Sequence, residues 1–577
     1  MSPSQIIVLA TPVFFAMIAI EWAWGYARGR NTYQLDDAIN SISLGMLSQI
    51  SAVLTRLLRL GIYTAVYSVV ALWHNEAFWT TWYGALIALV FYDFCYYWLH
   101  RAGHESAVFW AAHVVHHQSQ SYNLSTALRQ TSSGALLGWI FYLPMALAGV
   151  PPLVFGIVAL VDLLYQYWVH TEHIGKLGWF DRWFCSPSNH RVHHALNDGH
   201  LDRNYGGILI LWDRLFGSFR EEDVRCVYGT RDALHSWDPL WANAEVYWQL
   251  LRDSWHTRHW GDKLRVWFKT PGWRPDDVAA RFPKPPFSIT QVRQFAPQVS
   301  RGVKLLGAAH FALLLGGVAV FLWETDSLPF MTNLVWLCAL SAGLWTTGAL
   351  LQGRLQPLEL FIINSAALAT TSGALGLGAL HMVFKPLTMV LALAWVASAP
   401  VATKAPVFLK VLLGVALLAS LIGDVLLMLP GNHFIAGLVA FLSAHLAYIV
   451  LLQRSTPGGK WFPSRGALAC TLAVGALMVA ILWTGLPGPV LTGAVMAYVV
   501  VIALMAAQAI GRAGVRADAA SRFVAWGACF FMLSDSLLAI NKFMQPLPTA
   551  SLWILSTYYM AQVLIMRHVL LGVSKTD

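Results

Sequence analysis

Apolar runs long enough to cross a lipid bilayer recur along most of this 577-residue chain, and they constrain its fold more than any other feature. A helix of about 20 apolar residues spans the hydrocarbon core. In the first third we predict spans at 6–26, 57–73, 79–99, 131–150 and 152–169. From residue 303 onward we predict spans at 303–323, 331–351, 358–379, 383–400, 407–428, 434–452, 466–485, 487–510, 519–541 and 551–571. The sequence therefore predicts an all-α polytopic membrane protein.

Charged residues are scarce and unevenly placed. They make up 12% of the chain, against about 25% in a typical soluble domain. Residues 171–300 contain no spanning run, and residues 251–301 hold ten Lys and Arg against four Asp and Glu. Because basic loops stay in the cytosol, we predict that 171–300 forms a cytosolic helical cap. The net charge of +9 then reflects membrane topology rather than nucleic-acid binding.

This order of segments predicts three parts. They are a first domain over 1–300, connecting transmembrane helices over 301–365, and a multi-helix transmembrane bundle over 366–577. Counting spans outward from a cytosolic cap places loops 453–465 and 511–522 in the cytosol as well. These two loops carry Arg454, Lys460, Arg465, Arg512, Arg516 and Arg522, while the loops between them are nearly uncharged. The predicted topology is therefore consistent with its own charge pattern.

Half of the chain's 20 histidines lie in four short clusters. The clustered residues are His100, His104, His113, His116, His117, His170, His173, His190, His193 and His194. Spacings of three and four residues place side chains on one helical face, about 5–6 Å apart. Two such imidazoles bind one ion, and ten exceed what one ion uses. We therefore predict a site for two metal ions at the cytosolic ends of membrane helices.

The ligand type limits which metals can bind at this site. Neutral imidazole suits Zn, Cu, Fe and Ni, and an all-nitrogen site leaves iron redox-active and open to dioxygen. A structural or transport zinc site is the alternative. Metal-bound histidines usually donate their other N–H to a carboxylate or carbonyl, so we predict a catalytic role for Glu105, which follows His104. Asp93 is a carboxylate within a predicted span and a further functional candidate.

Longer motifs around the histidines resemble the fatty acid hydroxylase/sterol desaturase superfamily of di-iron membrane oxygenases. The segments YYWLHRAGHE (96–105), YNLSTALRQ (122–130), QYWVHTE (166–172) and SNHRVHH (188–194) are most similar to the alkylglycerol monooxygenase family. Two residues depart from that family's pattern. Gln120 stands where an acidic residue is expected, and His173 stands where an apolar residue is common.

The resemblance implies a reaction. Such an enzyme uses two iron ions, dioxygen and an external reductant, tetrahydrobiopterin in metazoan members, to hydroxylate the carbon next to the ether oxygen of an alkylglycerol. The product collapses to a fatty aldehyde. The electron donor of this chain is not implied. One alternative is a hydroxylase or desaturase of a sterol, carotenoid or fatty acyl chain, and another is a non-catalytic metal-binding or transport protein.

Ionisable residues within the later predicted spans mark a second candidate site. Each such residue costs on the order of 3 kcal/mol at the bilayer centre. Lys385, Asp424 and Asp535 fall at comparable depth towards the non-cytosolic ends of their helices, with His445 on another helix. Two carboxylates beside a lysine form a plausible acid/base centre. A structural ion-pair network is the alternative, and His445 has the simpler reading of a helix-packing residue.

Residues 366–577 resemble the YhhN family of multi-helix membrane proteins. The resemblance rests on FKPLT (384–388), LIGDVL (421–426), the positions Gly437, Phe441, His445 and Tyr448, and SDSLLA (534–539). Some members of that family are lysoplasmalogenases, which hydrolyse vinyl-ether lysolipids to an aldehyde. Both halves of the chain are therefore expected to act on ether lipids, one by oxidation and one by hydrolysis.

Overall fold

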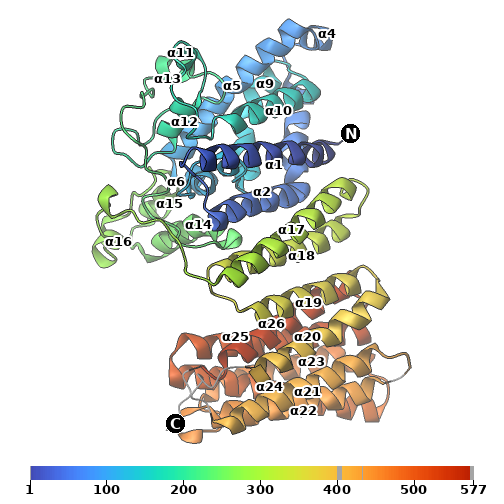
Figure 1. The fold of residues 1–577 in the computed structure, drawn as a ribbon. Helices are drawn as coiled ribbons and strands as arrows, with labels where there is room; N and C mark the ends of the chain where they lie inside the picture. The colour runs from blue at the N-terminus through green and yellow to red at the C-terminus, as the bar shows by residue number, and fades with distance from the viewer. Residues whose placement is uncertain (1, 399–405, 432, 572–577) are drawn as a thin grey trace. The chain divides into compact units, whose positions relative to one another are not determined.

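The structure of this chain is a computed structural model that describes residues 2–398, 406–431 and 433–571 (Figure 1). Every regular element within these ranges is helical, which confirms the predicted all-α class. The chain divides into two compact units, unit 1 over Met1–Arg354 and unit 2 over Leu355–Asp577. The domain boundaries predicted from the sequence stay a prediction. The helices between 301 and 351, predicted as connectors, pack within unit 1.

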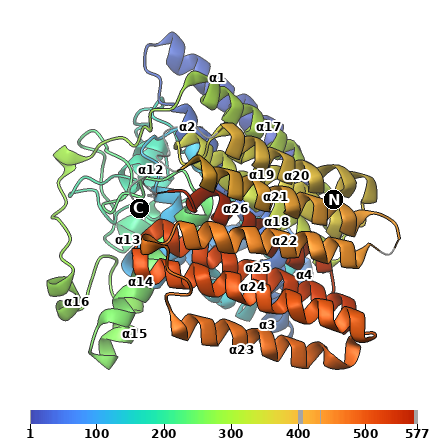
Figure 2. The same ribbon diagram turned by 90° about the horizontal axis from the view of Figure 1, so that it is seen from below.

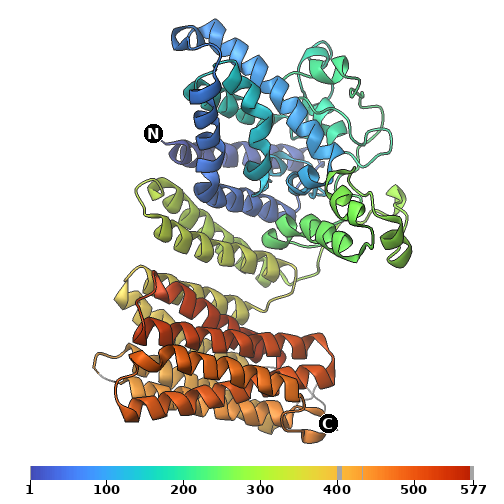
Figure 3. The same cartoon turned by 180° about the vertical axis from the view of Figure 1, so that it is seen from behind.

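Four long helices form one side of unit 1. They are α1 (Pro3–Ala27), α2 (Leu35–Arg56), α17 (Arg301–Glu324) and α18 (Phe330–Leu351). The antiparallel pair α17 and α18, yellow-green in Figure 3, packs against α2. The contact buries Ile42 and Ile50 of α2 with Phe321 and Leu344. Burying such side chains stabilises the packing by about 1.5–3 kcal/mol each in water, whereas within lipid close packing contributes most.

Two further helices carry the first and third histidine clusters. Thr81 caps the start of α5 (Trp82–Glu105) by accepting from the Gly84 amide, and α10 (Pro152–Trp168) packs against α5. The two helices and their neighbours bury Tyr63, Tyr92 and Phe155 in one aromatic core. His100 and His104 lie in the last turns of α5, and His170 follows the end of α10, so the packing of α5 on α10 fixes where those histidines lie.

Two predicted spans in unit 1 are wrong. The segment 131–150 folds into α8 (Gly134–Leu137), a 3₁₀ turn and α9 (Leu143–Leu147), which together are too short to cross a bilayer. The run predicted at 57–73 lies at the end of a longer helical stretch. That stretch consists of α2, a π-helical turn over Leu57–Gly61 and α3 (Ile62–Val70). Residues 40–55 therefore belong to a candidate span.

Shorter helices connect the long ones, and those between residues 171 and 300 belong to the polar region. They are α4 (Glu76–Trp79), α6 (Ala107–Ala111), α7 (Leu124–Ala127), α11 (Phe180–Trp183), α12 (Pro187–His193), α13 (Leu211–Leu215), α14 (Pro239–His256), α15 (Trp260–Phe268) and α16 (Asp276–Arg281), with 3₁₀ turns at Val114–His117, Gly138–Tyr142 and Ile289–Gln291. Loops therefore make up much of the polar region, and they position the metal-binding side chains.

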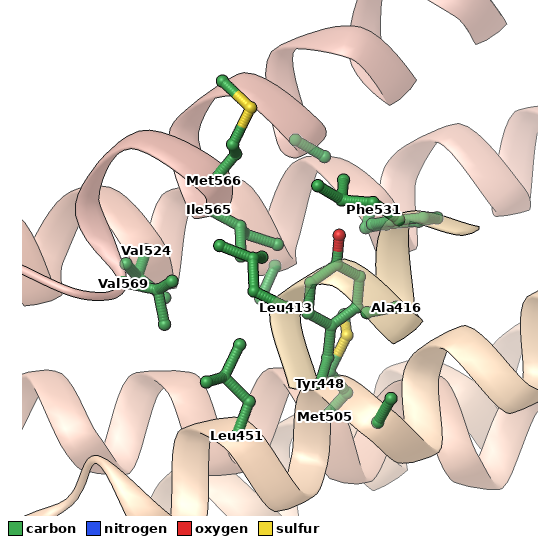
Figure 4. Packing of buried hydrophobic residues seen from close by; sticks show 14 of the residues in the cluster. Leu413, Ala416, Tyr448, Leu451, Met505, Val524, Phe531, Ile565, Met566 and Val569 are labelled. Atoms are coloured by element: carbon green, nitrogen blue, oxygen red, sulfur yellow. The ribbon is translucent and has the colours of Figure 1, made fainter. Parts of the chain in front are cut away.

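Unit 2 is a bundle of eight helices in the described part of the chain. They are α19 (Pro357–Ala374), α20 (Gly378–Ser398), α21 (Val407–Met428), α22 (Phe434–Arg454), α23 (Arg465–Leu482), α24 (Pro489–Arg516), α25 (Ala519–Phe543) and α26 (Ala550–His568), with 3₁₀ turns at Pro457–Gly459 and Trp483–Gly485. Figure 2 shows α22, α24 and α23 running side by side. The interior of the eight-helix bundle is closely packed around Leu413, Tyr448, Met505, Phe531 and Ile565 (Figure 4).

Ten helices among the described residues are long and apolar enough to cross a membrane. They are α1, α2, α17, α18, α20, α21, α22, α23, α24 and α25. The chain is therefore an integral membrane protein. The helices α5, α10, α19 and α26 lie at other predicted spans but fall outside this set, so their spanning of the bilayer stays a prediction. The cytosolic location of the cap is likewise a prediction.

Candidate metal centre

Nine of the ten predicted histidines converge into two groups in unit 1. The first group contains His100, His104, His113, His117 and His193, and the second contains His116, His170, His190 and His194. Within each group the potential ligand atoms all lie within 4.8 Å of one another. The second group is fully interior, and the first is nearly so. Two adjacent groups of this size fit two metal ions better than one.

Local structure explains how each cluster reaches the centre. His100 and His104 lie one turn apart at the end of α5, and His170 follows the end of α10. The turn Val114–His117 presents His116 and His117 in succession, towards different groups. Ser186 caps α12 by accepting from the Asn189 amide, and Pro187 begins that helix, which aims His190 and His193 inward.

Backbone carbonyls fix the protonation of four of these rings. The Nδ1 atom lies 2.8 Å from the Tyr205 carbonyl in His100, 2.9 Å from the Arg129 carbonyl in His116, 2.8 Å from the Gln166 carbonyl in His170, and 3.0 Å from the Arg203 carbonyl in His193. A carbonyl only accepts, so Nδ1 of each neutral ring must carry the hydrogen. Their Nε2 atoms therefore present lone pairs to the interior.

Those Nε2 atoms face one another at short range. His116 Nε2 lies 3.1 Å from the Nε2 atoms of both His170 and His194, and His170 Nε2 lies 3.1 Å from that of His190. Facing lone pairs repel unless a cation lies between them. Two nitrogens each about 2.1 Å from one ion at right angles are about 3.0 Å apart. The spacing therefore fits imidazoles that share a metal ion.

In the first group Nε2 atoms also lie close together, and two further Nε2 atoms have no hydrogen-bond partner among the described residues. His113 Nε2 lies 3.1 Å from His100 Nε2 and 3.0 Å from His117 Nε2. The Nε2 atoms of His104 and His193 are buried without a hydrogen-bond partner among the described residues. A buried polar atom without a partner costs about 1–3 kcal/mol. A metal ion would satisfy both atoms at once.

Burial also keeps His116, His190 and His194 in the neutral form that binds metals. Loss of solvent lowers the pKa of His116 to about 4. Burial is likewise the largest cause that holds the pKa of His190 and of His194 well below the usual value, with neighbouring imidazoles adding repulsion. A neutral imidazole is the ligand form, so no proton has to leave before an ion binds near neutral pH.

Sequence reasoning missed most of the groups that support the histidines. Asp202 accepts from His104 Nδ1 at 3.1 Å, and the Tyr205 carbonyl anchors His100. Asp213 in turn holds the Tyr205 amide at 2.7 Å. Asp202 and Asp213 lie about 100 residues along the chain from the helix that carries His100, so no spacing rule connects them. A carboxylate-rich stretch directly after the last histidine cluster was the only available signal.

Three predicted residues lie elsewhere than expected. His173 belongs to neither group, and its ring lies against the backbone at Gly25 of α1. Glu105 is half-exposed and pairs with Arg101 at 2.9 Å, away from the histidines, so its catalytic role remains a prediction. Asp93 is buried and accepts from the Ile208 amide at 2.7 Å and the Leu209 amide at 3.0 Å. It therefore holds the loop that follows Tyr205.

Gln120, the other departure from the family pattern, fastens a distant segment to the centre. Its side-chain amide donates to the Arg293 carbonyl at 2.9 Å, and its oxygen accepts from the Phe295 amide at 2.7 Å. This pair of bonds holds segment 293–295 against the chain that leaves the His116–His117 turn. A carboxylate has no hydrogen to donate and cannot make both bonds.

Lys385, Asp424 and Asp535, predicted as one acid/base centre in unit 2, are divided between two centres in the structure. In one, Lys385 lies 3.4 Å from Asp424, which also accepts from the Tyr558 hydroxyl at 2.6 Å. In the other, Tyr498 hydrogen-bonds to Asp535, and His445 Nε2 lies 2.8 Å from the Tyr498 oxygen. Tyr558 and Tyr498 were not predicted. The structure brings Lys385 to Asp424 and His445 to Asp535.

A helical membrane fold that gathers buried imidazoles at two adjacent points defines the class of membrane metal hydroxylases. The fatty acid hydroxylase family matches residues 85–218, and the YhhN family matches residues 380–569. The chain belongs to the alkylglycerol monooxygenase family and is an oxidoreductase of the monooxygenase class, with a lysoplasmalogenase-like domain of the YhhN family.

Three relatives illustrate this assignment. Alkylglycerol monooxygenase of Homo sapiens is 35% identical over 349 residues, which cover 60% of this chain and 77% of the relative. The enzyme of that name from Xenopus tropicalis is 36% identical over 55% of this chain and 70% of its own length. Lysoplasmalogenase TMEM86B of Sus scrofa is 38% identical over 152 residues, 26% of this chain and 59% of that protein. No solved structure matches the chain.

Proposed function

We propose that unit 1 is a di-iron monooxygenase that hydroxylates the ether-adjacent carbon of alkylglycerol lipids. One observation carries the proposal: buried Nε2 atoms face one another in two groups, and backbone carbonyls fix four of the nine rings from behind. The activity named for the relatives supports the choice of ether lipids. Iron is chosen because nitrogen ligands of this kind suit a redox metal that reacts with dioxygen.

In this proposal the nine converging histidines hold the two ions, five around one and four around the other. Bound iron would supply the oxidising power, as cofactors do for chemistry that side chains cannot perform. The chain's own residues hold the rings in place and exclude water. Carbonyls at Tyr205, Arg129, Gln166 and Arg203 fix four ring orientations before any ion binds. Such preorganisation removes an ordering cost from metal binding.

The overall reaction balances with one external reductant. An alkyl ether R–CH₂–O–R′, dioxygen, two electrons and two protons give R–CH(OH)–O–R′ and water. The hemiacetal then breaks its C–O bond to release an aldehyde and the alcohol HO–R′. The two electrons come from an external donor, for which a tetrahydropterin is the first candidate. The lipid chain stays in the bilayer while its polar end meets the histidines.

The test uses the full-length protein purified in lipid nanodiscs. We expect about two iron ions per chain by elemental analysis and oxygen uptake that depends on an alkylglycerol and a reductant such as tetrahydrobiopterin. Fatty aldehyde should form in proportion to the oxygen consumed. Oxygen uptake with a sterol, carotenoid or fatty acyl substrate instead would favour the alternative hydroxylase or desaturase. Bound zinc without oxygen uptake on any lipid would favour a non-catalytic metal protein.

We also infer that the histidine centre faces the cytosol. The basic bias of residues 251–301 supports this orientation. Asp198 is fully exposed on the same polar region, with its side chain 89% accessible. In right-side-out vesicles, Asp198→Cys should resist a membrane-impermeant maleimide until the vesicles are opened. Labelling of intact vesicles would reverse the orientation.

Unit 2 supports a second function, hydrolysis of the vinyl ether of a lysoplasmalogen. Two carboxylates, each hydrogen-bonded by a tyrosine, support acid/base chemistry by Lys385, Asp424 and Asp535, with Lys385 beside Asp424 and Asp535 in the second centre. The name of the relative from Sus scrofa points the same way. We expect Asp424→Asn or Asp535→Asn to abolish aldehyde release from a 1-alkenyl lysolipid, whereas Asp518→Asn at the cap of α25 should not. Full activity in both carboxylate variants would remove the acid/base assignment.

A further inference from the structure

A cavity opens between α22, α23, α24 and α25 in unit 2, and its wall includes Asp535. The enclosed part of the cavity is about 70 Å³, and about 760 Å³ lies between the side chains when the open mouth is counted. Its lining is almost entirely apolar: Leu427, Phe434, Leu438, Phe441, Gly475, Met478, Leu482, Val495, Val499, Ile502, Met532, Leu538, Ala539 and Phe543. Tyr498, Asp535 and Ser536 are the polar side chains on this wall. Such a lining suits one aliphatic chain with its polar end near Asp535.

A directed chain of hydrogen bonds ends at that carboxylate. The Tyr498 hydroxyl donates its single hydrogen to Asp535, so its oxygen is left to accept from His445 Nε2 at 2.8 Å. His445 Nδ1 then faces the weakly accepting sulfur of Met505 at 3.3 Å. The donors therefore run from His445 through Tyr498 to Asp535. His445 is fully buried, whereas the Asp535 side chain is 16% exposed.

The second carboxylate of unit 2 lies outside this wall. Asp424 is enclosed by Lys385 and Tyr558 and is not among the lining residues. It is still near enough for its charge to act on Asp535. The ring of Phe531 lies between the centres, 4.6 Å from the His445 ring and 5.5 Å from the Tyr558 ring. Asp535 is thus the carboxylate that a molecule in the cavity would meet.

We propose that this cavity takes the alkenyl chain of a single-chain 1-alkenyl glycerol lipid and that Asp535, supported by Tyr498 and His445, is its proton donor. The proposal rests on the hydrolase function inferred for unit 2. Asp535 transfers a proton to the β-carbon of R–CH=CH–O–R′, and the vinyl π bond breaks as a C–H bond forms. Water adds to the resulting oxocarbenium carbon and returns its proton to Asp535. The hemiacetal breaks its C–O bond to give R–CH₂–CHO and HO–R′.

Tyr498 and His445 have separate parts in this step. The Tyr498 hydroxyl donates to the carboxylate that appears when Asp535 gives up its proton, which favours the transfer. His445 polarises Tyr498 without reaching the cavity, so it is a positioning residue. Asp535 is faced by Tyr498 on α24, by His445 on α22 and, at longer range, by Asp424 on α21 with its partner Lys385 on α20.

The first experiment measures aldehyde release by the full chain over a range of substrate concentrations. Tyr498→Phe should lower kcat on the order of tenfold to hundredfold with little change in KM. His445→Leu should lower kcat by less, again with little change in KM, and His445→Gln, which keeps a donor, should restore it. Wild-type kcat in both Tyr498→Phe and His445→Leu would overturn the relay.

The second experiment separates this site from the hydrolase function itself. Its probe is a 1-alkyl lysophospholipid, which has no vinyl bond, used without a reductant so that unit 1 is idle. Ala539→Phe fills the cavity and should weaken binding about tenfold or more, while Leu533→Phe, on the lipid-facing side of the same helix, should not. Binding that is equal in both variants would overturn the cavity assignment. Probe binding that depends on Ala539, without wild-type hydrolysis of any 1-alkenyl lipid, would retain a chain-binding cavity but overturn the hydrolase function and the proton transfer.

Discussion

The two polar centres of this chain are held in opposite ways. In unit 1 backbone carbonyls fix four of the histidine rings from behind, and Asp202 holds a fifth. In unit 2 the carboxylates are held by tyrosine hydroxyls on other helices, Tyr558 for Asp424 and Tyr498 for Asp535. Carbonyls are fixed by the fold and only accept, whereas a hydroxyl rotates and both donates and accepts. The first arrangement suits fixed metal ligands, and the second suits a group that gains and loses a proton.

The largest effect that separates the two centres is expected from His193→Ala. Removing this buried Nε2 from the five-histidine group should reduce bound iron and lower alkylglycerol turnover by about hundredfold or more, since one lost ligand weakens the whole site. Vinyl-ether hydrolysis by unit 2 should be unchanged. Elemental analysis and both assays on one preparation measure this. His173→Ala is the matched control and should keep its iron, because His173 lies outside both groups.

A smaller loss is expected when the carboxylate behind His104 is changed. Asp202→Asn should lower metal affinity about 10- to 100-fold, the usual cost of removing a group that orients a ligand. Asparagine tolerates the left-handed backbone at this position, where φ is +54°, so the loop should keep its shape. Competition with a chelator measures the affinity. Asp198→Asn removes a fully exposed carboxylate nearby and should leave the metal affinity unchanged. Equal affinity in the two variants would mean that Asp202 does not support His104.

Acid should destabilise the metal-free protein through unit 1. The folded-state pKa of His116 is about 4, below the ordinary value of about 6.5. The unfolded chain therefore binds protons first, and stability falls as pH drops from about 6.5 to about 4. The slope should approach on the order of 1 kcal/mol per pH unit for such a histidine. Thermal unfolding of metal-free protein at several pH values measures it, and His116→Gln should flatten the dependence. An unchanged slope would contradict it.

The smallest effect is expected from Glu105→Gln. This variant tests the catalytic role that the sequence predicts for Glu105. The Glu105 carboxylate is half-exposed and pairs with Arg101. Exposed pairs of this kind contribute about 0–1 kcal/mol. We therefore expect alkylglycerol turnover to change less than about twofold. A loss of hundredfold or more would restore Glu105 as a catalytic group and would mean that α5 moves when substrate binds.

The same contrast explains what the sequence could predict. Histidines repeat at helical spacing within short clusters, so the sequence predicts that ten of them converge, and nine do. Their division into a group of five and a group of four was not predicted. His173 has the same spacing from His170, but the chain leaves its helix after α10, and the spacing rule no longer applies. Asp202 and Tyr498 were missed because their partners lie on distant segments. Only packing brings them together.

Helix prediction shows a related limit. Long apolar runs in unit 2 gave helices close to those observed, because length and hydropathy alone define a span. The run 131–150 has similar hydropathy but folds into short helical segments, with Gly138 at the end of α8 and Pro144 in the first turn of α9. Such breaks are tolerated where neighbouring protein covers the backbone. The aromatic core around Tyr92 and Tyr142 provides that cover.

The two hydrogen bonds of Gln120 join parts of unit 1 that are far apart in the sequence. One side-chain amide bonds both the Arg293 carbonyl and the Phe295 amide, so the segment that leads to α17 is attached to the chain that follows His116 and His117. Replacing that amide by a carboxylate would remove one of the two bonds while leaving the side-chain volume almost unchanged. The choice of nitrogen or oxygen at one atom therefore decides whether this attachment has two hydrogen bonds or one.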